Sequence, residues 1–361
     1  MRAKDFRHVM AKVMALRRMG GPTRAMAASY DPEGLFAGKA RVKTKLGAVD
    51  RPQWLRDLKK VPVDACDASG GAPVEALEPR IKEELAKMLA QEYLPVDLDA
   101  PGVKVHHLDP PVLTVDGFLT PAECDLFVEE TLRSETLKRS TVGEGNLDSE
   151  RNLQSETRTS RSVLLSMEVQ TEHQGLKDLA QKLQTRAKQI FQVERWSPTG
   201  VLPGPDQVCF EALQVAVYKE GEHFLSHEDG FPQAVVESNG FQRVATVLLY
   251  LNDVEVGGRT RFDFLNLAVQ PRKGTVLLFF PGFSNCASDP RSVHTAEDAV
   301  DEKWVCQQWI ARGVPVDNPL SDNGPSVGSE VQGELFRQVK KGKGKAAKGK
   351  KGAASRGFGA R

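Results

Sequence analysis

The chain has 361 residues, enough for two domains or for one large domain with appended segments. Hydrophobic residues make up 40% of it, which allows a sizeable core and argues against wholesale disorder. The net charge of +1 hides an asymmetry. Residues 340–361 carry nine Lys or Arg and no acid, so the remainder sums to −8 (1 − 9).

The cysteine pattern argues against two kinds of small scaffold. Five cysteines are widely scattered and form no CxxC pair; they are Cys66, Cys124, Cys209, Cys286 and Cys306. Neither a disulfide framework nor a structural zinc site is expected, and the pattern fits a reducing compartment. No apolar run reaches the length of about 18 residues that a membrane helix needs, so we expect no membrane span.

The N-terminal segment 1–30 is basic, with seven Lys or Arg and one acid, Asp5. Apolar residues recur in it at helical spacing, which is typical of an organelle transit peptide and also of an ordinary surface helix. Because Lys12, Arg17 and Arg18 interrupt the apolar stretch, no secretory signal is expected. We therefore expect an intracellular protein, cytoplasmic or nuclear, with a plastid or mitochondrion as the alternative.

The first strongly periodic segment follows a Gly-, Pro- and Asp-rich stretch, residues 31–74, that we interpret as mostly loop. From Glu75 to Tyr93, leucine or isoleucine recurs every four residues, which predicts an amphipathic helix. Pro79 stands near its start and Pro95 ends it.

Beyond Asp109 the chain changes character. A short strand and a turn are expected first, then a helix capped by Thr120 before Pro121. Residues 140–160 are polar and rich in Ser and Thr, so we interpret them as a mobile loop. A second helix is expected over 175–191.

The next part of the chain is rich in strand-like runs. They are short, β-branched or aromatic, and separated by Gly, Pro, Asn and Asp; they cover 209–218, 223–228, 244–251, 259–264, 275–280 and 303–310. Helices first and strands after indicate an α+β protein with an antiparallel sandwich or barrel buttressed by helices. We expect three regions: an N-terminal extension of unknown function, 1–107; a strand-rich domain, 108–315; and a disordered Lys/Gly-rich tail, 316–361.

The sequence FLSHEDGF at 224–231 contains a candidate metal-binding pair. In a strand, side chains two residues apart share a face, so His227 and Asp229 point the same way. Two histidines and one carboxylate on one face are the ligand set of non-haem iron(II) oxygenases. The pair alone is weak support, so a third ligand is needed.

His294 is the preferred third ligand. It lies between two strongly apolar strands, GTVLLFFPG and KWVCQQWI, and can fold back over the pair. His223 is the rival, because it lies four residues before His227 on the same strand face. The other histidines lie outside the strand-rich region.

Several ordered motifs together resemble the catalytic core of prolyl 4-hydroxylases. They are Tyr218 nine residues before the HxD triplet, RVATVLLYLNDVEVGGRTRF at 243–262, the distal His294, and the Lys303–Trp304 pair. The match extends over about 108–315, and its weaker beginning includes RTS at 158–160.

The resemblance implies a double-stranded β-helix, or jelly-roll, core that binds Fe(2+) and 2-oxoglutarate. His227, Asp229 and His294 would be the catalytic iron ligands. The enzyme would convert 2-oxoglutarate and O2 to succinate and CO2 while hydroxylating a prolyl residue of a protein or peptide. L-ascorbate would restore iron oxidised in uncoupled turnovers.

The resemblance also implies the co-substrate contacts. Lys303 would pair with the distal carboxylate of 2-oxoglutarate, and Tyr218 and Thr260 would hydrogen-bond the same molecule. Strand parity places Lys303, Val305, Gln307 and Trp309 on one face, so Lys303 and Trp309 can both line the pocket. A solvated lysine at a strand end is the alternative for Lys303.

Some features depart from the family pattern. The stretch TAEDAVDE after His294 lacks the family's Pro and Gly, and the loop GFPQAVVESNG after Asp229 lacks an aromatic pattern typical of a peptide groove. Two alternatives therefore stay open: the same chemistry on another side chain or a small metabolite, and a non-catalytic jelly-roll binding module. The loops 140–160 and 230–240 would form the substrate lid.

The remaining motifs have ordinary structural interpretations. GEGN at 143–146 and GGR at 257–259 are read as turns, because neither joins a strand to a helix as phosphate cradles do. Core or rim packing is expected for Trp196, Phe283 and Trp304, and a buried thiol for Cys286 and Cys306. For the tail 340–361 we expect a solvated segment, with weak nonspecific nucleic-acid contact as the alternative. The sequence leaves the oligomeric state open.

Overall fold

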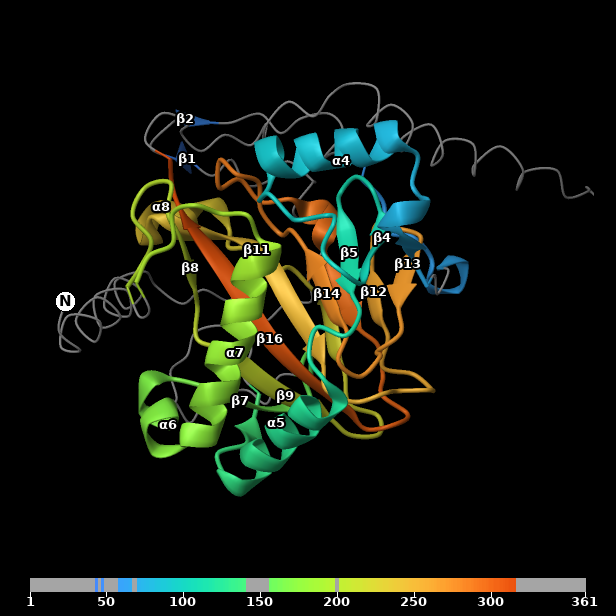
Figure 1. Ribbon diagram of the computed structural model, residues 1–361, viewed down its shortest axis with the longest axis vertical. Helices are drawn as coiled ribbons and strands as arrows, with labels where there is room; N and C mark the ends of the chain where they lie inside the picture. The colour runs from blue at the N-terminus through green and yellow to red at the C-terminus, as the bar shows by residue number, and fades with distance from the viewer. Residues whose placement is uncertain are drawn as a thin grey trace, which may run out of the picture. The chain divides into compact units, whose positions relative to one another are not determined.

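A computed structural model describes residues 58–66, 70–140, 156–198 and 201–315, together with the short paired strands β1 (Lys43–Thr44) and β2 (Gly47–Ala48) (Figure 1). The predictions made for 1–30, for GEGN at 143–146 and for the tail 316–361 lie outside these residues. So does most of the expected loop 140–160. None of the helices in the described ranges is long and apolar enough to cross a membrane.

The described part of the chain is built around a large antiparallel sheet. Its strands follow the order β3-β4-β5-β14-β11-β16-β9-β7-β6, and β8 also pairs with β16. The strands are β3 (Ala72–Pro73), β4 (Val103–His107), β5 (Val112–Val115), β6 (Lys138–Arg139), β7 (Arg161–Leu164), β8 (Val208–Phe210), β9 (Gln214–Tyr218), β11 (Phe241–Tyr250), β14 (Val276–Phe279) and β16 (Lys303–Gly313).

A smaller antiparallel sheet faces one side of the large one. Its four strands, in spatial order, are β10 (Phe224–His227), β15 (His294–Ala296), β12 (Thr260–Phe262) and β13 (Leu267–Val269). A shared apolar cluster joins the two sheets, with Leu248 and Val305 from the large sheet and Phe262 and Val269 from the small one. The space between the sheets is therefore a packed core, and the site lies within it.

Helices cover the opposite face of the large sheet (Figure 1). They are α4 (Pro79–Glu92), α5 (Pro121–Arg133), α6 (Met167–Glu172) and α7 (Gln174–Ile190). Their apolar residues, such as Leu89, Phe127 and Leu183, join the outward side chains of the strands in one cluster. Because both faces of β16 are covered, nearly all of its residues are buried, as expected for a central strand.

Local capping explains where α5 begins. The Thr120 hydroxyl accepts a hydrogen bond from the Glu123 backbone N–H, and the Glu123 carboxylate accepts one from the Thr120 N–H. This reciprocal pair satisfies two backbone donors that the first helical turn leaves free, and Pro121 at the first position needs no partner. The predicted cap is confirmed.

The mixed helix and antiparallel-sheet class is confirmed, and most predicted elements are present. The expected helices over 75–93 and 175–191 appear as α4 and α7. The predicted strand 209–218 divides into β8 and β9. Phe283 and Trp304 belong to the core cluster and Trp196 packs against it, as expected; Cys286 and Cys306 are buried free thiols.

The prediction of a loop over 230–240 was wrong. The segment contains α8 (Gln233–Asn239), which ends at Gly240 in the left-handed conformation with φ of 77°. Glycine adopts this conformation without the steric cost that other residues meet, so it is a common helix end. The helix has seven residues, too few for a recognisable hydrophobic period.

Residues assigned to an N-terminal extension contribute to the main body. β4 pairs with β5 and with β3, and α4 packs in the same core as α5 and α7. The division of the chain at 107 and 315 stays a prediction.

A buried ionic network holds together three distant segments. Arg291 is 1% exposed; its guanidinium donates to both carboxylate oxygens of Asp289 (2.8 and 2.7 Å), to Asp109 Oδ1 (2.9 Å) and to the Tyr93 hydroxyl (2.9 Å). Tyr93 follows α4, Asp109 precedes β5, and Arg291 lies three residues before His294. The network therefore anchors the chain directly before β15.

Replacing this arginine tests the network. Arg291→Met should lower the free energy of unfolding by about 3–5 kcal/mol, because it leaves two buried carboxylates without their cation. Chemical denaturation of the full chain measures the change.

A matched control is Arg272→Met, which removes an exposed ion pair with Glu255, 3.5 Å long. That variant should lose no more than about 1 kcal/mol. Equal losses in the two variants would show that Arg291 does not anchor the fold.

Candidate active site

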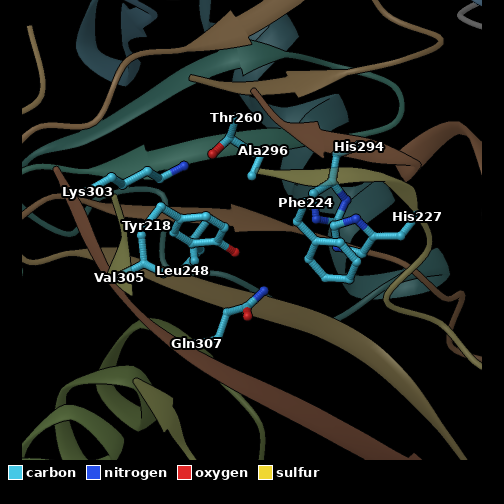
Figure 2. A pocket seen from close by; sticks show the side chains of 10 residues that line it. All are labelled: Tyr218, Phe224, His227, Leu248, Thr260, His294, Ala296, Lys303, Val305 and Gln307. Carbon is cyan, nitrogen blue, oxygen red and sulfur yellow. The ribbon is translucent and has the colours of Figure 1, made fainter. Parts of the chain in front are cut away.

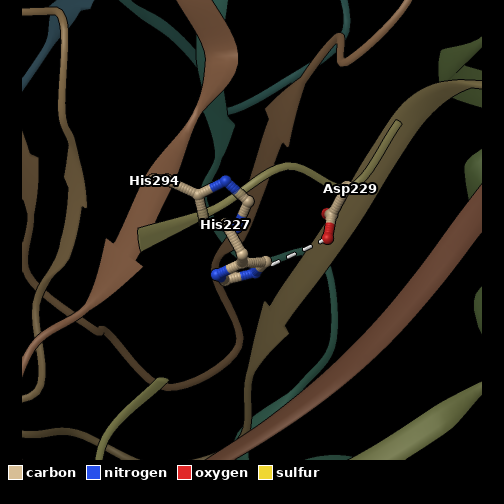
Figure 3. Close-up of side chains that lie close together, drawn as sticks. All are labelled: His227, Asp229 and His294. Carbon is tan, nitrogen blue, oxygen red and sulfur yellow. Dashed lines mark ion pairs between the residues drawn. The ribbon is translucent and has the colours of Figure 1, made fainter. Parts of the chain in front are cut away.

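Three side chains from separate positions converge between the sheets (Figure 3). β10 and β15 pair in a register that sets His227 opposite His294, and Asp229 follows β10 by two residues. One potential ligand atom from each of the three lies within 4.8 Å of the others. Figure 3 also shows the 3.7 Å approach of His227 Nε2 to Asp229 Oδ1. The expected proximity is present, although β10 ends at His227, so Asp229 reaches its place through a turn and not by strand parity.

The hydrogen bonds of the two imidazoles leave one nitrogen of each for a metal. His227 Nδ1 lies 2.9 Å from the Leu225 carbonyl oxygen, and His294 Nδ1 lies 3.0 Å from that of Ser292. A carbonyl oxygen only accepts, so each Nδ1 carries the proton and each Nε2 keeps its lone pair. His227 Nε2 is buried and has no hydrogen-bond partner among the described residues. These neutral donors suit a divalent metal ion.

The charge states of the cluster also suit a metal. Burial, together with the neighbouring His294, lowers the pKa of His227 to about 3, so its imidazole is neutral near pH 7. Burial alone would raise the pKa of Asp229, but His294, His227, Arg243 and a hydrogen bond from Thr246 lower it overall. The cluster therefore combines two imidazoles and one carboxylate, the ligand set that non-haem iron(II) sites use.

A pocket opens beside the two histidines (Figure 2). It is lined by side chains of both sheets: Tyr218, Phe224, His227, Leu248, Thr260, His294, Ala296, Lys303, Val305 and Gln307. Figure 2 shows Lys303 on one side of the pocket and the histidines on the other. The pocket can thus hold a small molecule that reaches from a cation to the metal-binding cluster.

Lys303 is a buried cation without a counter-ion. Its residue is 2% exposed, and no described residue makes a hydrogen bond or ion pair with its ammonium. The ammonium lies over the rings of Tyr218 and Tyr250, at 5.5 and 5.8 Å. Burial lowers the pKa of Lys303 to about 7, against an opposing effect of Glu297. A solvated lysine is thereby ruled out, and an anionic ligand would offset the cost of burying this charge.

Two hydroxyl groups stand near this lysine. The Tyr250 hydroxyl donates to Thr260 Oγ1 at 2.9 Å, so the hydrogen of Thr260 is left to donate elsewhere. Tyr218 pairs directly with Lys303 across β9 and β16. An ammonium and hydroxyl donors at one end of a pocket fit a carboxylate, so the residues present fit 2-oxoglutarate as well as the metal.

Comparisons with known proteins agree with this geometry. Residues 213–311 match the family model described as the 2OG-Fe(II) oxygenase superfamily. Prolyl 4-hydroxylase 2 of Arabidopsis thaliana is 32% identical over 223 residues, which cover 56% of this chain and 67% of that protein. This chain belongs to the prolyl 4-hydroxylase family.

Two further comparisons cover the same share of the chain. Probable prolyl 4-hydroxylase 7 of Arabidopsis thaliana is 32% identical over 221 residues, covering 56% of this chain and 62% of that relative's length. The crystal structure of viral collagen prolyl hydroxylase from Paramecium Bursaria Chlorella virus-1, a 2-oxoglutarate complex, is 23% identical with a TM-score of 0.40, covering 56% of this chain and 96% of that one.

Two residues considered from the sequence lie outside this prolyl 4-hydroxylase-family site: Trp309, expected in the pocket, and His223, the rival metal ligand. Trp309 is on the predicted strand face but is not among the residues that line the pocket. Its ring packs against the Arg243 guanidinium at 4.0 Å, and its buried indole N–H has no hydrogen-bond partner in the described ranges. The rival ligand His223 is outside the cluster, with Nδ1 3.0 Å from Asp298.

Sequence reasoning missed two residues that support Asp229. The Thr246 hydroxyl donates to Asp229 Oδ2 at 2.8 Å, and the Arg243 guanidinium donates to the Asp229 carbonyl oxygen at 3.3 Å. Arg243 is itself held by Glu211 at 2.7 and 2.8 Å. Both residues belong to the family motif that begins at Arg243, so the signal was present, but their target was visible only in three dimensions.

Removing the hydroxyl that orients Asp229 should weaken metal binding. Thr246→Val is expected to raise the dissociation constant for Fe(2+) or Mn(2+) roughly tenfold to a hundredfold, because partners that orient metal ligands have effects of this size. Calorimetric titration with the metal measures it. Thr275→Val removes a comparable hydroxyl bond to Asp116, 3.2 Å long and remote from the cluster, and should leave metal affinity unchanged.

The titration of Lys303 predicts how 2-oxoglutarate affinity depends on pH. With its pKa near 7 in the free protein, Lys303 loses its charge as the pH rises, and binding of a dianion must then restore the proton. Affinity should be constant below about pH 6 and fall above about pH 7, by up to about tenfold per pH unit. Titrations of metal-loaded protein with 2-oxoglutarate measure this profile.

Lys303→Arg is the control for that profile. A guanidinium stays protonated over this range, so the variant should show a flat dependence even if its affinity is lower at every pH. A steep profile in the variant would assign the pH effect to another group.

Proposed function

We propose that the chain hydroxylates a prolyl residue in a protein or peptide, converting 2-oxoglutarate and O2 to succinate and CO2. The observation that carries the proposal is one pocket with the His227, Asp229 and His294 cluster at one end and the unpaired cation of Lys303 at the other. Proline as the target is supported by the relatives, which are named prolyl 4-hydroxylases.

The protein's contribution to this reaction is to bind, orient and shield. When bound, ferrous iron and 2-oxoglutarate would supply the oxidative decarboxylation that activates O2, and one oxygen atom of O2 enters the C–H bond. His227, Asp229 and His294 would hold the metal, and Lys303 and Thr260 would bind the far carboxylate of the acid. The apolar lining limits water in the pocket, which strengthens these electrostatic contacts.

Finer features belong to the same proposal. The face-to-face packing of two antiparallel sheets supports a double-stranded β-helix core. L-ascorbate is proposed as the reductant that restores oxidised iron.

We propose an intracellular site of action, cytoplasmic or nuclear, on the basis of the scattered, unpaired cysteines.

Turnover across a peptide library tests the function. The purified chain is supplied with Fe(2+), 2-oxoglutarate, ascorbate and proline-containing peptides, and succinate release is measured alongside mass spectrometry of the peptides. The expected result is peptide-stimulated succinate formation and a gain of one oxygen atom on a prolyl residue.

Two histidine-to-alanine variants test whether the activity depends on the metal-binding cluster. His294→Ala should abolish both products, whereas His223→Ala, at a histidine outside the cluster, should keep them. Hydroxylation of a different side chain would replace proline as the target. Failure of the wild-type chain to bind ferrous iron and to release succinate would point to a non-catalytic module.

A further inference from the structure

Gln307 is a polar residue of the pocket wall with no established role. Its side chain lines the pocket together with Lys303, His227 and His294, and Figure 2 shows the amide pointing inward between the lysine and the histidines. The residue is 6% exposed. No hydrogen bond joins its amide to a described residue, so the amide is open to the pocket.

The strand neighbours of Gln307 form no hydrogen bond with it. It pairs across the sheet with Leu248, which is apolar, and with Gln214. The Gln214 amide is already engaged, since its Oε1 accepts from Arg158 at 2.8 Å and its Nε2 donates to Ser162 at 3.4 Å. The amide of Gln307 is thus left facing the pocket.

The next residue shows how the same strand treats a structural glutamine. Gln308 points to the opposite face, where its Nε2 donates to the carbonyl oxygens of Glu211 (2.7 Å) and Trp309 (3.1 Å). Its Oε1 accepts from Gln184 at 2.9 Å. Because the fold fully pairs one buried amide and leaves its neighbour unpaired, the free amide of Gln307 fits a ligand contact.

The position of Gln307 along β16 selects the ligand atoms. Gln307 lies four positions after Lys303, which corresponds to about 13 Å along a strand. The two side chains therefore reach different parts of the pocket and cannot grip the same carboxylate. With Lys303 at the far end, Gln307 meets the half of a bound acid that is nearer the metal-binding cluster.

We propose that the Gln307 amide donates a hydrogen bond to the metal-side carboxylate of 2-oxoglutarate and so positions the acid for reaction. The inference rests on the proposed function, because it takes 2-oxoglutarate as the pocket's ligand. A neutral donor suits this place, since it holds an anionic oxygen without competing with Asp229 for the metal's charge.

Binding measurements on three variants test the proposal without turnover. Gln307→Leu removes the donor at similar volume, and Gln307→Glu replaces it with a negative charge. 2-Oxoglutarate is titrated into Mn(2+)-loaded full-length protein by calorimetry. The dissociation constant should rise roughly ten- to hundredfold in the Leu variant and more in the Glu variant. Gln307→Asn, which keeps a shorter amide, should fall between the wild type and Gln307→Leu.

Two further measurements separate this role from a structural one. The affinity for Mn(2+) alone and the thermal unfolding temperature of the Leu or Asn variant should match the wild type. In turnover assays the KM for 2-oxoglutarate should rise while the KM for peptide stays constant. An unchanged 2-oxoglutarate affinity in Gln307→Leu, or a rise only in the KM for peptide, would overturn the proposal and assign Gln307 to the peptide or to packing.

The controls distinguish this failure from that of the proposed function. If wild-type protein binds Mn(2+) and 2-oxoglutarate but Gln307→Leu binds them equally well, only the role of Gln307 is lost. If the wild type binds no 2-oxoglutarate at any pH tested, the co-substrate itself is wrong, and both proposals fail together.

Discussion

The pairing of β10 with β15 is the interaction on which the site depends. It sets His227 directly opposite His294, and a slip of one residue would turn one imidazole to the other face of the sheet. The chain before β15 is held by Arg291, whose buried guanidinium joins segments far apart in sequence. The register of β10 with β15 and the hydrogen bonds of Arg291 together fix the distance between the two imidazoles, which metal binding requires.

Buried polar groups fall into two classes in this molecule. The polar ends of Arg291 and Gln308 are paired with other residues, and their role is to fix strands and loops in place. Lys303 and Gln307 are buried as deeply, yet no described residue pairs with their polar ends. A protein keeps such costly groups where a ligand completes them.

The two ends of the pocket differ in how their surroundings change the pKa values of the side chains there. At the cluster, burial and the neighbouring His294 lower the pKa of His227, whereas the two imidazoles and Arg243 outweigh burial and lower the pKa of Asp229. At the other end, burial works against the charge of Lys303, which makes that cation sensitive to whether an anion is present. Binding of the acid and protonation of Lys303 are thereby coupled.

Local sequence predicted most of the elements and named the candidate site residues. Periodicity predicted α4 and α7, Thr120 and Pro121 predicted the start of α5, and ordered motifs pointed to the cluster and to Lys303. These signals lie within a few residues of one another or repeat at fixed spacing, so they can be read along the chain. Alternation along β16 also placed Gln307 on the same strand face as Lys303. The sequence did not show that the Gln307 amide lacks a hydrogen-bond partner among the described residues.

Tertiary structure decided what depends on contacts between distant segments. The bond from Thr246 to Asp229, the network around Arg291, and the position of Trp309 beyond the pocket lining all involve partners separated by many residues. The helix α8 escaped prediction because seven residues carry too little periodic signal and its glycine end also suits a turn. Sequence thus determined which chemical groups are available, while only the packing of two sheets decided which of them face one another and which buried charges lack a partner.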